Sequence, residues 1–331
     1  MRQERRQGVE IHRIEMPTPL AIGSVNAFLI VEGDERILVD CGPRHEATQT
    51  ALLSGLQQFG LNPEDVTGLV LTHGHVDHVG LARLFQSHGV PIYSHPDVNT
   101  WLNPDGEWVN YRQDFYHRLY RECGLPTEVL GRTLQEYSIY HSLNDRSVVD
   151  VHLEDGKTFP VLPRFRVIYV PGHAQAALAL FDEENGDLIV GDQLLPRVSS
   201  NALIEPRLDA QSGSEAERTK SLLQYRENLQ TLRTYPIRRV HPGHGETFED
   251  VHALIDQRLT DQETRKARFL RLLQDSQPCT AFELATAFFP RHSHQTSLIL
   301  SETLGYLDWL SADGSVMSSA GDDGIVRWST V

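Results

Sequence analysis

The chain has few cysteines. Three of its 331 residues are cysteine, and Cys41, Cys123 and Cys279 lie far apart in the sequence. An odd number without paired spacing predicts neither a disulfide framework nor a structural zinc site of the cysteine type. Unpaired cysteines in this number are typical of a reducing compartment.

Long apolar runs are also missing. No run approaches the roughly 18 residues that a membrane span needs. The charged start MRQERRQGVE is not followed by the apolar stretch of a signal peptide. We therefore expect a cytoplasmic protein with no membrane partner.

Positive charge is scarce. The chain has 30 Lys and Arg against 45 Asp and Glu, a formal net charge of −15. Contacts from basic side chains to phosphates supply most non-specific affinity for nucleic acid. The composition therefore predicts no nucleic-acid partner and favours a small-molecule substrate.

Strand and helix patterns alternate through residues 1–259, for which we predict one α/β catalytic domain. NAFLIVEGDERILVDCG predicts two strands, 27–31 and 36–40, joined by a Gly-Asp turn. VHLEDGKTF and ALALFDEENGDLIVGD predict further hairpins, closing at Asp155-Gly156 and Asn185-Gly186. Further elements are predicted as helices over 46–59, 79–87 and 221–235, and as strands over 68–71 and in IRRVHPGHGE.

Two segments differ from this pattern. Residues 97–148 predict a helical insert rich in aromatic side chains, which could form either a lid over a pocket or the core of a helical layer. Residues 260–331 predict three helices and a hairpin, as in a small winged-helix-like domain. The insert's aromatic residues are Trp101, Trp108, Tyr111, Phe115, Tyr116, Tyr120, Tyr137 and Tyr140.

The stretch THGHVDHVG, residues 72–80, follows a short apolar strand. His73 and His75 are two residues apart, so an extended segment places them on one face, where they can bind one ion. Asp77 and His78 lie past the bend and can face a second ion. Imidazole nitrogens and carboxylate oxygens suit zinc, iron or manganese.

Further candidate ligands each follow a predicted strand. His173 comes after Pro171-Gly172, Asp192 after Gly191, and His244 lies within PGHGE. The glycines allow sharp turns and a close approach of the backbone to an ion. Seven ligands are too many for one tetrahedral ion and suit two ions, with one carboxylate bridging them.

These motifs resemble a known family. THGHVDHVG resembles the signature of the metallo-β-lactamase superfamily, and VPGHAQ, VGDQ and PGHGE match its other metal motifs in the same order. The first predicted hairpin also looks like that of the family, with Asp40 in the usual Asp-x-Gly place. The resemblance covers residues 10–255 and implies an αββα sandwich with metals at the strand ends.

The resemblance also implies a ligand assignment. His73, His75 and His173 would hold one ion, Asp77, His78 and His244 would hold the other, and Asp192 would bridge. Two divalent ions are implied, usually zinc, with iron or manganese as alternatives. They would share a hydroxide that attacks the substrate, and the catalytic residue Asp77 would orient it and return a proton. We expect Ser199 and Ser200 to be loop residues, because no base is recognisable beside them.

Several features narrow the substrate class. Asp192 stands where β-lactamases of the family carry cysteine, no flavodoxin-like domain follows, and the negative charge disfavours a nuclease. The insert interrupts the sandwich, whereas a glyoxalase II would place its glutathione-binding region after it. The remaining substrates are lactones, esters and thioesters. Alternatives are a non-hydrolytic ligand sensor and an iron-dependent sulfur dioxygenase.

The predicted C-terminal domain has little positive charge. Its candidate recognition helix, TSLILSETLGYLDWL, contains no lysine or arginine. Because DNA binding depends on phosphate contacts, we expect this domain to pack against the sandwich or to form a homodimer contact.

Overall fold

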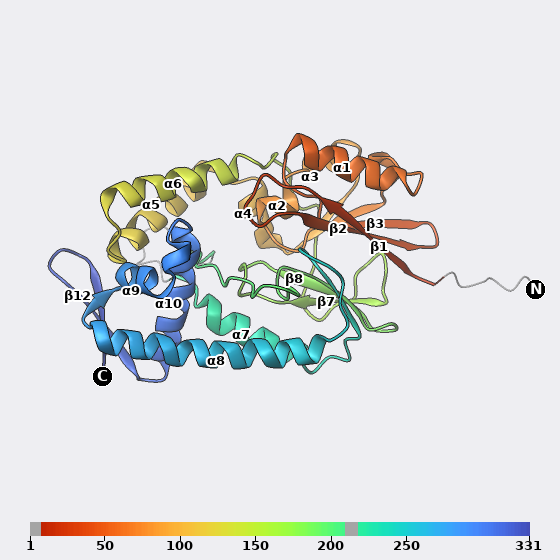
Figure 1. The fold of residues 1–331 in the computed structure, drawn as a ribbon. Helices are drawn as coiled ribbons and strands as arrows, with labels where there is room; N and C mark the ends of the chain where they lie inside the picture. Colours follow the sequence, from red (N-terminus) through yellow and green to blue (C-terminus); the bar gives the residue numbers. More distant parts are fainter. Residues whose placement is uncertain (1–7, 209–217) are drawn as a thin grey trace, which may run out of the picture.

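The computed structural model describes residues 8–208 and 218–331 (Figure 1). Two sheets face each other, with helices on both outer sides and a cluster of further helices at one end. Among the described residues, no helix is long and apolar enough to cross a membrane.

The first sheet has six strands in sequence order, β1-β2-β3-β4-β5-β6. The first three pair antiparallel, and the pairs from β3 to β6 are parallel. Because β3 and β4 are parallel, their carboxyl ends lie on the same edge. The strands are Glu10–Met16, Val25–Glu32, Glu35–Val39, Gly68–Val70, Ile92–Ser94 and Val151–His152.

The second sheet has four strands in the order β10-β9-β8-β7. β10 runs parallel to β9, and the other pairs are antiparallel. The carboxyl ends of β7, β9 and β10 therefore lie on the same edge. The strands β7 to β10 are Phe165–Tyr169, Leu178–Asp182, Asp187–Gly191 and Arg239–Pro242.

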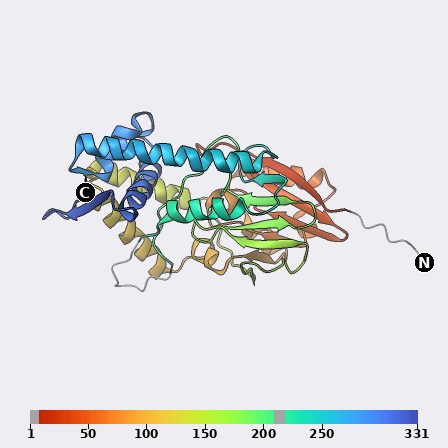
Figure 2. The same cartoon turned by 90° about the horizontal axis from the view of Figure 1, so that it is seen from below.

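Alternating side chains hold the layers together. Phe28 and Ile30 of β2 lie in the apolar core shared by the two sheets, whereas Leu29 between them packs in the cluster that includes residues of α1, Glu46–Gln57, and α3, Ala82–Ser87. The second sheet's outer face packs against α7, Ser221–Leu232, and α8, Val251–Ser276 (Figure 2). The predicted αββα sandwich is confirmed.

Most predicted elements are present, but one hairpin was wrong. The turn at Asp155-Gly156 exists, yet the strand before it, β6, pairs in parallel with β5 of the first sheet. After the turn, Thr158 bridges to Arg166 of β7. The turn therefore carries the chain from the first sheet to the second.

The insert is helical, as predicted. It contains α4, Asn99–Leu102, α5, Gly106–Glu122, and α6, Thr127–His141. Phe115, Tyr116 and other residues of α5 share one apolar cluster with the C-terminal helices. Much of the aromatic content therefore serves as core. Short 3₁₀ turns cover Pro63–Asp65, Pro96–Val98 and Pro290–His292.

The C-terminal segment packs against the sandwich, in line with one of the two expectations. Gly305 of α10, Thr296–Ala312, lies directly on Leu222 of α7, and Asp308 pairs with Arg218 and Lys220. The predicted domain boundary at residue 260 falls within α8 and stays a prediction, as does a homodimer contact. The remaining elements are β11, Cys279–Thr280, α9, Ala281–Phe288, α10, Thr296–Ala312, β12, Val316–Ala320, and β13, Val326–Thr330, with the three strands in the order β11-β13-β12.

Candidate metal centre

Five strands of the two sheets deliver the candidate ligands and one supporting carboxylate to one edge. Asp40 follows β3, the HGHVDH segment follows β4, His173 follows β7, Asp192 follows β9 and His244 follows β10. The sequence predicted this placement at the carboxyl ends of strands. It brings together candidate ligands that lie as far apart in the sequence as His73 and His244.

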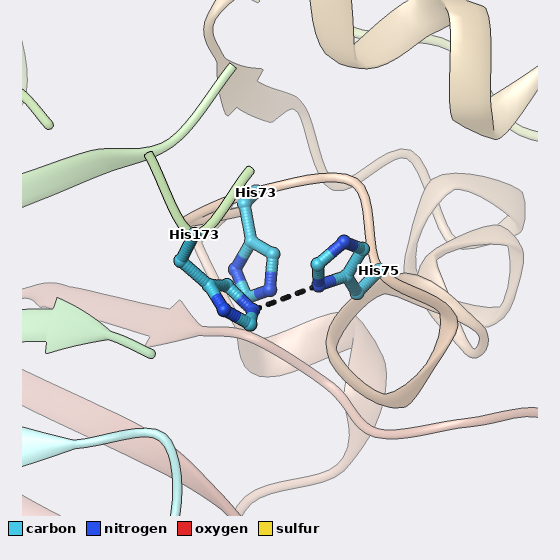
Figure 3. A group of neighbouring side chains, drawn as sticks. All are labelled: His73, His75 and His173. Atoms are coloured by element: carbon cyan, nitrogen blue, oxygen red, sulfur yellow. Dashed lines mark hydrogen bonds between the residues drawn. The ribbon is translucent and has the colours of Figure 1, made fainter. Parts of the chain in front are cut away.

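Three histidines form the first group, called here the three-histidine triad: His73, His75 and His173. Their rings face a common centre (Figure 3). The Nδ1 atom of His75 lies 2.9 Å from Nε2 of His173. All three are at least 91% buried. One nitrogen from each ring can reach a single ion placed between them.

A second group, the mixed triad, consists of Asp77, His78 and His244. Asp77 and His78 lie in α2, Val76–Val79, a separate helical turn before α3, so the single helix predicted over 79–87 was wrong and the segment forms two short helices. This first helical turn rotates both side chains away from His75. Asp77 Oδ2 is 3.4 Å from Nε2 of His244, so these groups also surround one point.

Asp192 lies between the two triads. Its carboxylate oxygens are 3.3 Å from Nε2 of His244 and 3.4 Å from Nε2 of His78 in the mixed triad. The same carboxylate is 3.7 Å from Nε2 of His173 in the three-histidine triad. This is the position that a bridging ligand would occupy. A Cβ on Gly243 would collide with this carboxylate, so only glycine permits the approach.

The outward-facing ring nitrogens are held by hydrogen bonds. Nδ1 of His244 donates to the carbonyl of Ser24 at 2.6 Å, and Nδ1 of His173 donates to that of Asn201 at 2.8 Å. Nδ1 of His78 lies 2.8 Å from Asp40 Oδ2. Such outer partners fix the tautomer and aim the other nitrogen at an ion.

The inward-facing atoms fit metal ions. Buried polar atoms in proteins nearly always have a hydrogen-bond partner, yet Nε2 of His73, His78 and His244 and Oδ1 of Asp192 have none. Nitrogen and carboxylate donors of this kind suit divalent zinc, iron or manganese. The structure brings together all seven predicted ligands, and their coordination of ions stays a prediction.

The two triads differ in how tightly they hold protons without an ion. Burial and the neighbouring His78 hold the pKa of His73 well below its usual value. Burial and the neighbouring His75 lower the pKa of His173 to about 4. Burial also disfavours charge on His244, but the Asp192 carboxylate outweighs it and raises the pKa of His244 to about 10.

The carboxylates of the site stay ionised. Burial opposes this at Asp77, but the positive charges of His78 and of the nearby His244 hold the pKa of that carboxyl well below its usual value. His78 has a raised pKa for the complementary reason, since Asp192 and Asp40 outweigh its burial. In the metal-free protein, protons on the mixed triad thus supply positive charge that an ion would otherwise supply.

Sequence reasoning missed one polar residue of the site. The hydroxyl of Tyr140, in α6, donates to Asp77 Oδ1 at 3.0 Å. Tyr140 was one of eight aromatics in the insert, and no sequence signal distinguished it, because its contact depends on how α6 docks. Trp101, also from the insert, packs so closely on Gly74 that a Cβ there would collide with the indole ring.

Two further residues have roles that the motif alone did not define. Asp40 accepts from the backbone N–H and the hydroxyl of Thr72, each at 2.8 Å, and faces His78. Its φ of 61° is in the left-handed region, which aspartate tolerates better than most residues. Ser200 is a loop residue, as predicted, but the stated reason was wrong, because its hydroxyl lies 2.9 Å from Nδ1 of His173. That nitrogen carries the proton that it donates to the Asn201 carbonyl, so it is not a base for Ser200.

Comparisons with known proteins agree with this geometry. The model of the metallo-beta-lactamase superfamily matches residues 20–244, and that of the metallo-beta-lactamase-like C-terminal domain matches residues 267–331. The probable metallo-hydrolase YqjP of Bacillus subtilis is 32% identical over 315 residues, covering 93% of this chain and 94% of the relative.

Solved structures show the same fold over nearly the whole chain. The metallo-beta-lactamase family protein TTHA1429 of Thermus thermophilus is 26% identical, with a TM-score of 0.82 over 97% of this chain and 98% of that one. A beta-lactamase domain protein of Burkholderia ambifaria is 23% identical, with a TM-score of 0.75 over 97% and 92%. The chain belongs to the metallo-β-lactamase superfamily.

Proposed function

We propose that the protein is a dinuclear metal-dependent hydrolase that cleaves a lactone, ester or thioester of a small molecule. The observation that carries the proposal is the position of Asp192, whose carboxylate lies within 3.7 Å of histidines from both triads. Membership of the superfamily and similarity to a probable metallo-hydrolase support hydrolysis as the reaction class.

The chain's own residues would divide the work. His73, His75 and His173 would hold one ion, and Asp77, His78 and His244 the other. Two bound divalent ions supply Lewis acidity and lower the pKa of a shared water towards neutrality.

Asp77 is placed to orient the attacking water. Its Oδ2 faces His244, while its Oδ1 accepts the hydroxyl of Tyr140. Tyr140 therefore fixes the rotation of the carboxylate, and the lowered pKa of Asp77 keeps it ionised, so that it would accept a hydrogen bond from the water and take its proton only transiently as the acyl bond breaks. In product formation the same carboxylate would pass that proton to the leaving oxygen or sulfur.

The surroundings of the site support an acyl substrate. Aromatic rings of the insert lie beside the HGHVDH segment, since Trp101 packs on Gly74 and the hydroxyl of Tyr140 donates to Asp77. Such rings suit an apolar acyl chain or ring. The net charge of −15 disfavours a polyanionic substrate.

The test is a panel of lactones, esters and thioesters assayed with protein loaded with zinc, iron or manganese. We expect turnover of at least one acyl class, and His75→Ala should lose metal and turnover together. Full metal occupancy with no turnover on any acyl substrate would overturn the proposal. One iron per chain together with oxygen consumption would instead identify the sulfur dioxygenase alternative.

A further inference from the structure

A buried arginine in the insert has no carboxylate partner among the described residues. Arg112 of α5 is 6% exposed, and its Nε and Nη1 atoms have no hydrogen-bond partner. Within residues 8–208 and 218–331, no carboxylate forms an ion pair with it. An arginine stays charged in proteins, and an unpaired buried charge is costly. The positive charge of Arg112 is therefore not balanced by a carboxylate of the described residues.

Aromatic rings only partly compensate for this charge. The guanidinium carbon lies 5.4 Å from the ring centre of Trp101 and 5.3 Å from that of Tyr137. Cation–π contacts are weaker than a charge-assisted hydrogen bond to an anionic oxygen. They hold the guanidinium in place and leave the N–H groups of Nε and Nη1 without acceptors.

Other polar nitrogens near Arg112 also lack partners. Nε1 of Trp108 and Nε2 of His141 are buried without a hydrogen-bond partner. Trp108 and Arg112 are four residues apart on α5 and so share a helix face. The rings of Trp108 and His141 lie 6.3 and 6.0 Å from that of Trp101, which is also the neighbour of Arg112.

This cluster lies next to the metal centre. Trp101 packs on Gly74, between two residues of the three-histidine triad. His141 follows Tyr140, whose hydroxyl binds Asp77. The nearby carboxylate of Glu205 is already engaged, because it accepts the backbone N–H of Gln175 at 2.8 Å and lies 3.8 Å from Nε2 of His75.

We propose that Arg112, Trp108 and His141, walled by Trp101 and Tyr137, form a subsite that binds a carboxylate group of the substrate. This deepens the proposed function and rests on it: the scissile acyl bond would lie at the metal centre while a carboxylate elsewhere in the same molecule binds Arg112. The substrate class is then an acyl compound that bears a free carboxylate.

The charge of the subsite comes from arginine alone. Burial, together with the nearby Arg112, lowers the pKa of His141 to about 2, so this ring is neutral at ordinary pH and contributes a hydrogen bond only. One positive charge matches the single charge of a carboxylate, whereas a doubly charged phosphate would need more.

The first experiment compares two substrates with the same scissile ester, one ending in a carboxylate and the other in the matching carboxamide. Wild type should prefer the carboxylate in kcat/KM, mainly through KM. Arg112→Met should reduce this preference about 10- to 100-fold, and Arg112→Lys should lie between, because lysine keeps the charge and loses the planar fork. Arg132→Met, an exposed arginine of α6, is the matched control. An unchanged preference in Arg112→Met overturns the subsite.

A second measurement does not depend on turnover. Butyrate, titrated calorimetrically into the full chain, should bind to wild type and Arg132→Met and lose binding in Arg112→Met. If no acyl substrate is turned over while this binding persists, the proposed function fails and the subsite stands. Binding of inorganic phosphate in place of butyrate overturns the carboxylate assignment.

Protein stability separates a binding role from a structural one. Because Arg112 lacks an anionic partner, Arg112→Met should have a melting temperature equal to or above that of wild type without ligand. A melting temperature lowered by several degrees would show that the arginine serves the fold, which contradicts the proposal.

Discussion

The two triads differ in charge although they share one edge of the fold. The three-histidine triad contains imidazole side chains only, whereas the mixed triad also contains the carboxylate of Asp77. Without metal, His73 and His173 have lowered pKa values, while His78 and His244 have raised ones. The same residue type is thus tuned in opposite directions within one site.

The difference shows that neighbouring carboxylates, and not burial, decide the outcome. Burial opposes protonation at all four of these histidines, but only His78 and His244 have carboxylates close enough to reverse it. His73 and His173 can therefore bind an ion at neutral pH without losing a proton, whereas an ion must displace protons from His78 and His244.

The largest effect is expected for Asp192→Ala, which removes the carboxylate between the triads. Metal analysis should show weakened binding of both ions. Turnover should fall on the order of 10³-fold or more, because metal ions supply several kcal/mol of transition-state stabilisation and each 1.4 kcal/mol is about tenfold. Retention of two tightly bound ions would mean that Asp192 does not bridge.

The next largest effect separates the triads. His244→Ala should lose the ion of the mixed triad and keep the ion of the three-histidine triad. His173→Ala should instead weaken binding of the ion in the three-histidine triad. Both should reduce turnover by about 10²-fold or more, since loss of a ligand exceeds the 10–100-fold effect of an outer partner. Metal stoichiometry with cadmium or cobalt spectra distinguishes the remaining ligand sets. Identical spectra for the two variants would contradict two distinct positions.

A smaller effect is expected from Asp40→Asn, which removes the charge behind His78 and keeps a side chain that tolerates the left-handed backbone. The second ion should bind about 10- to 100-fold more weakly, as measured by competition with a chelator. The matched change at the three-histidine triad is Ser200→Ala, which removes the hydroxyl beside Nδ1 of His173. It should have the smaller effect, because the Asn201 carbonyl still holds His173. The reverse order would contradict the comparison.

The pH dependence should also differ between the triads. His78 and His244 have raised pKa values and are protonated at neutral pH, so an ion must displace a proton from each of them. For each displaced proton, the affinity for the ion falls about tenfold when the pH falls by one unit. His73 and His173 have lowered pKa values and begin to compete only at lower pH. Titrations between pH 8 and pH 6 should therefore release the ion of the mixed triad first. Simultaneous release would contradict this assignment.

The sequence could predict the strand-end ligands because each directly follows a strand. His173 and His244 are 71 residues apart, but both come after β-strands and a Pro-Gly pair, and a sandwich brings such ends together. The residues from the insert could not be predicted in this way. Tyr140 and Arg112 are placed by the docking of α5 and α6, which depends on tertiary packing and leaves no local pattern.

The same limit explains the wrong hairpin. A Gly turn between two β-like stretches favours a hairpin locally, but Val151 pairs with Tyr93 instead. Choice of partner strand depends on the whole sheet. The sequence Asp155-Gly156 predicted the turn, but it could not predict which strands pair with the segments on either side of it.

The long helix α8 has a consequence for how the molecule can be divided. It runs unbroken from Val251 beside the sandwich to Ser276 among the C-terminal helices, a length of about 39 Å at 1.5 Å per residue. A rod of this kind offers no hinge, and Phe269 within it is fully buried. Ending the chain at residue 260 would interrupt α8 and expose apolar side chains of the sandwich that the C-terminal helices cover. The two family segments are thus one mechanical unit, and a shortened version should aggregate rather than act as a minimal enzyme.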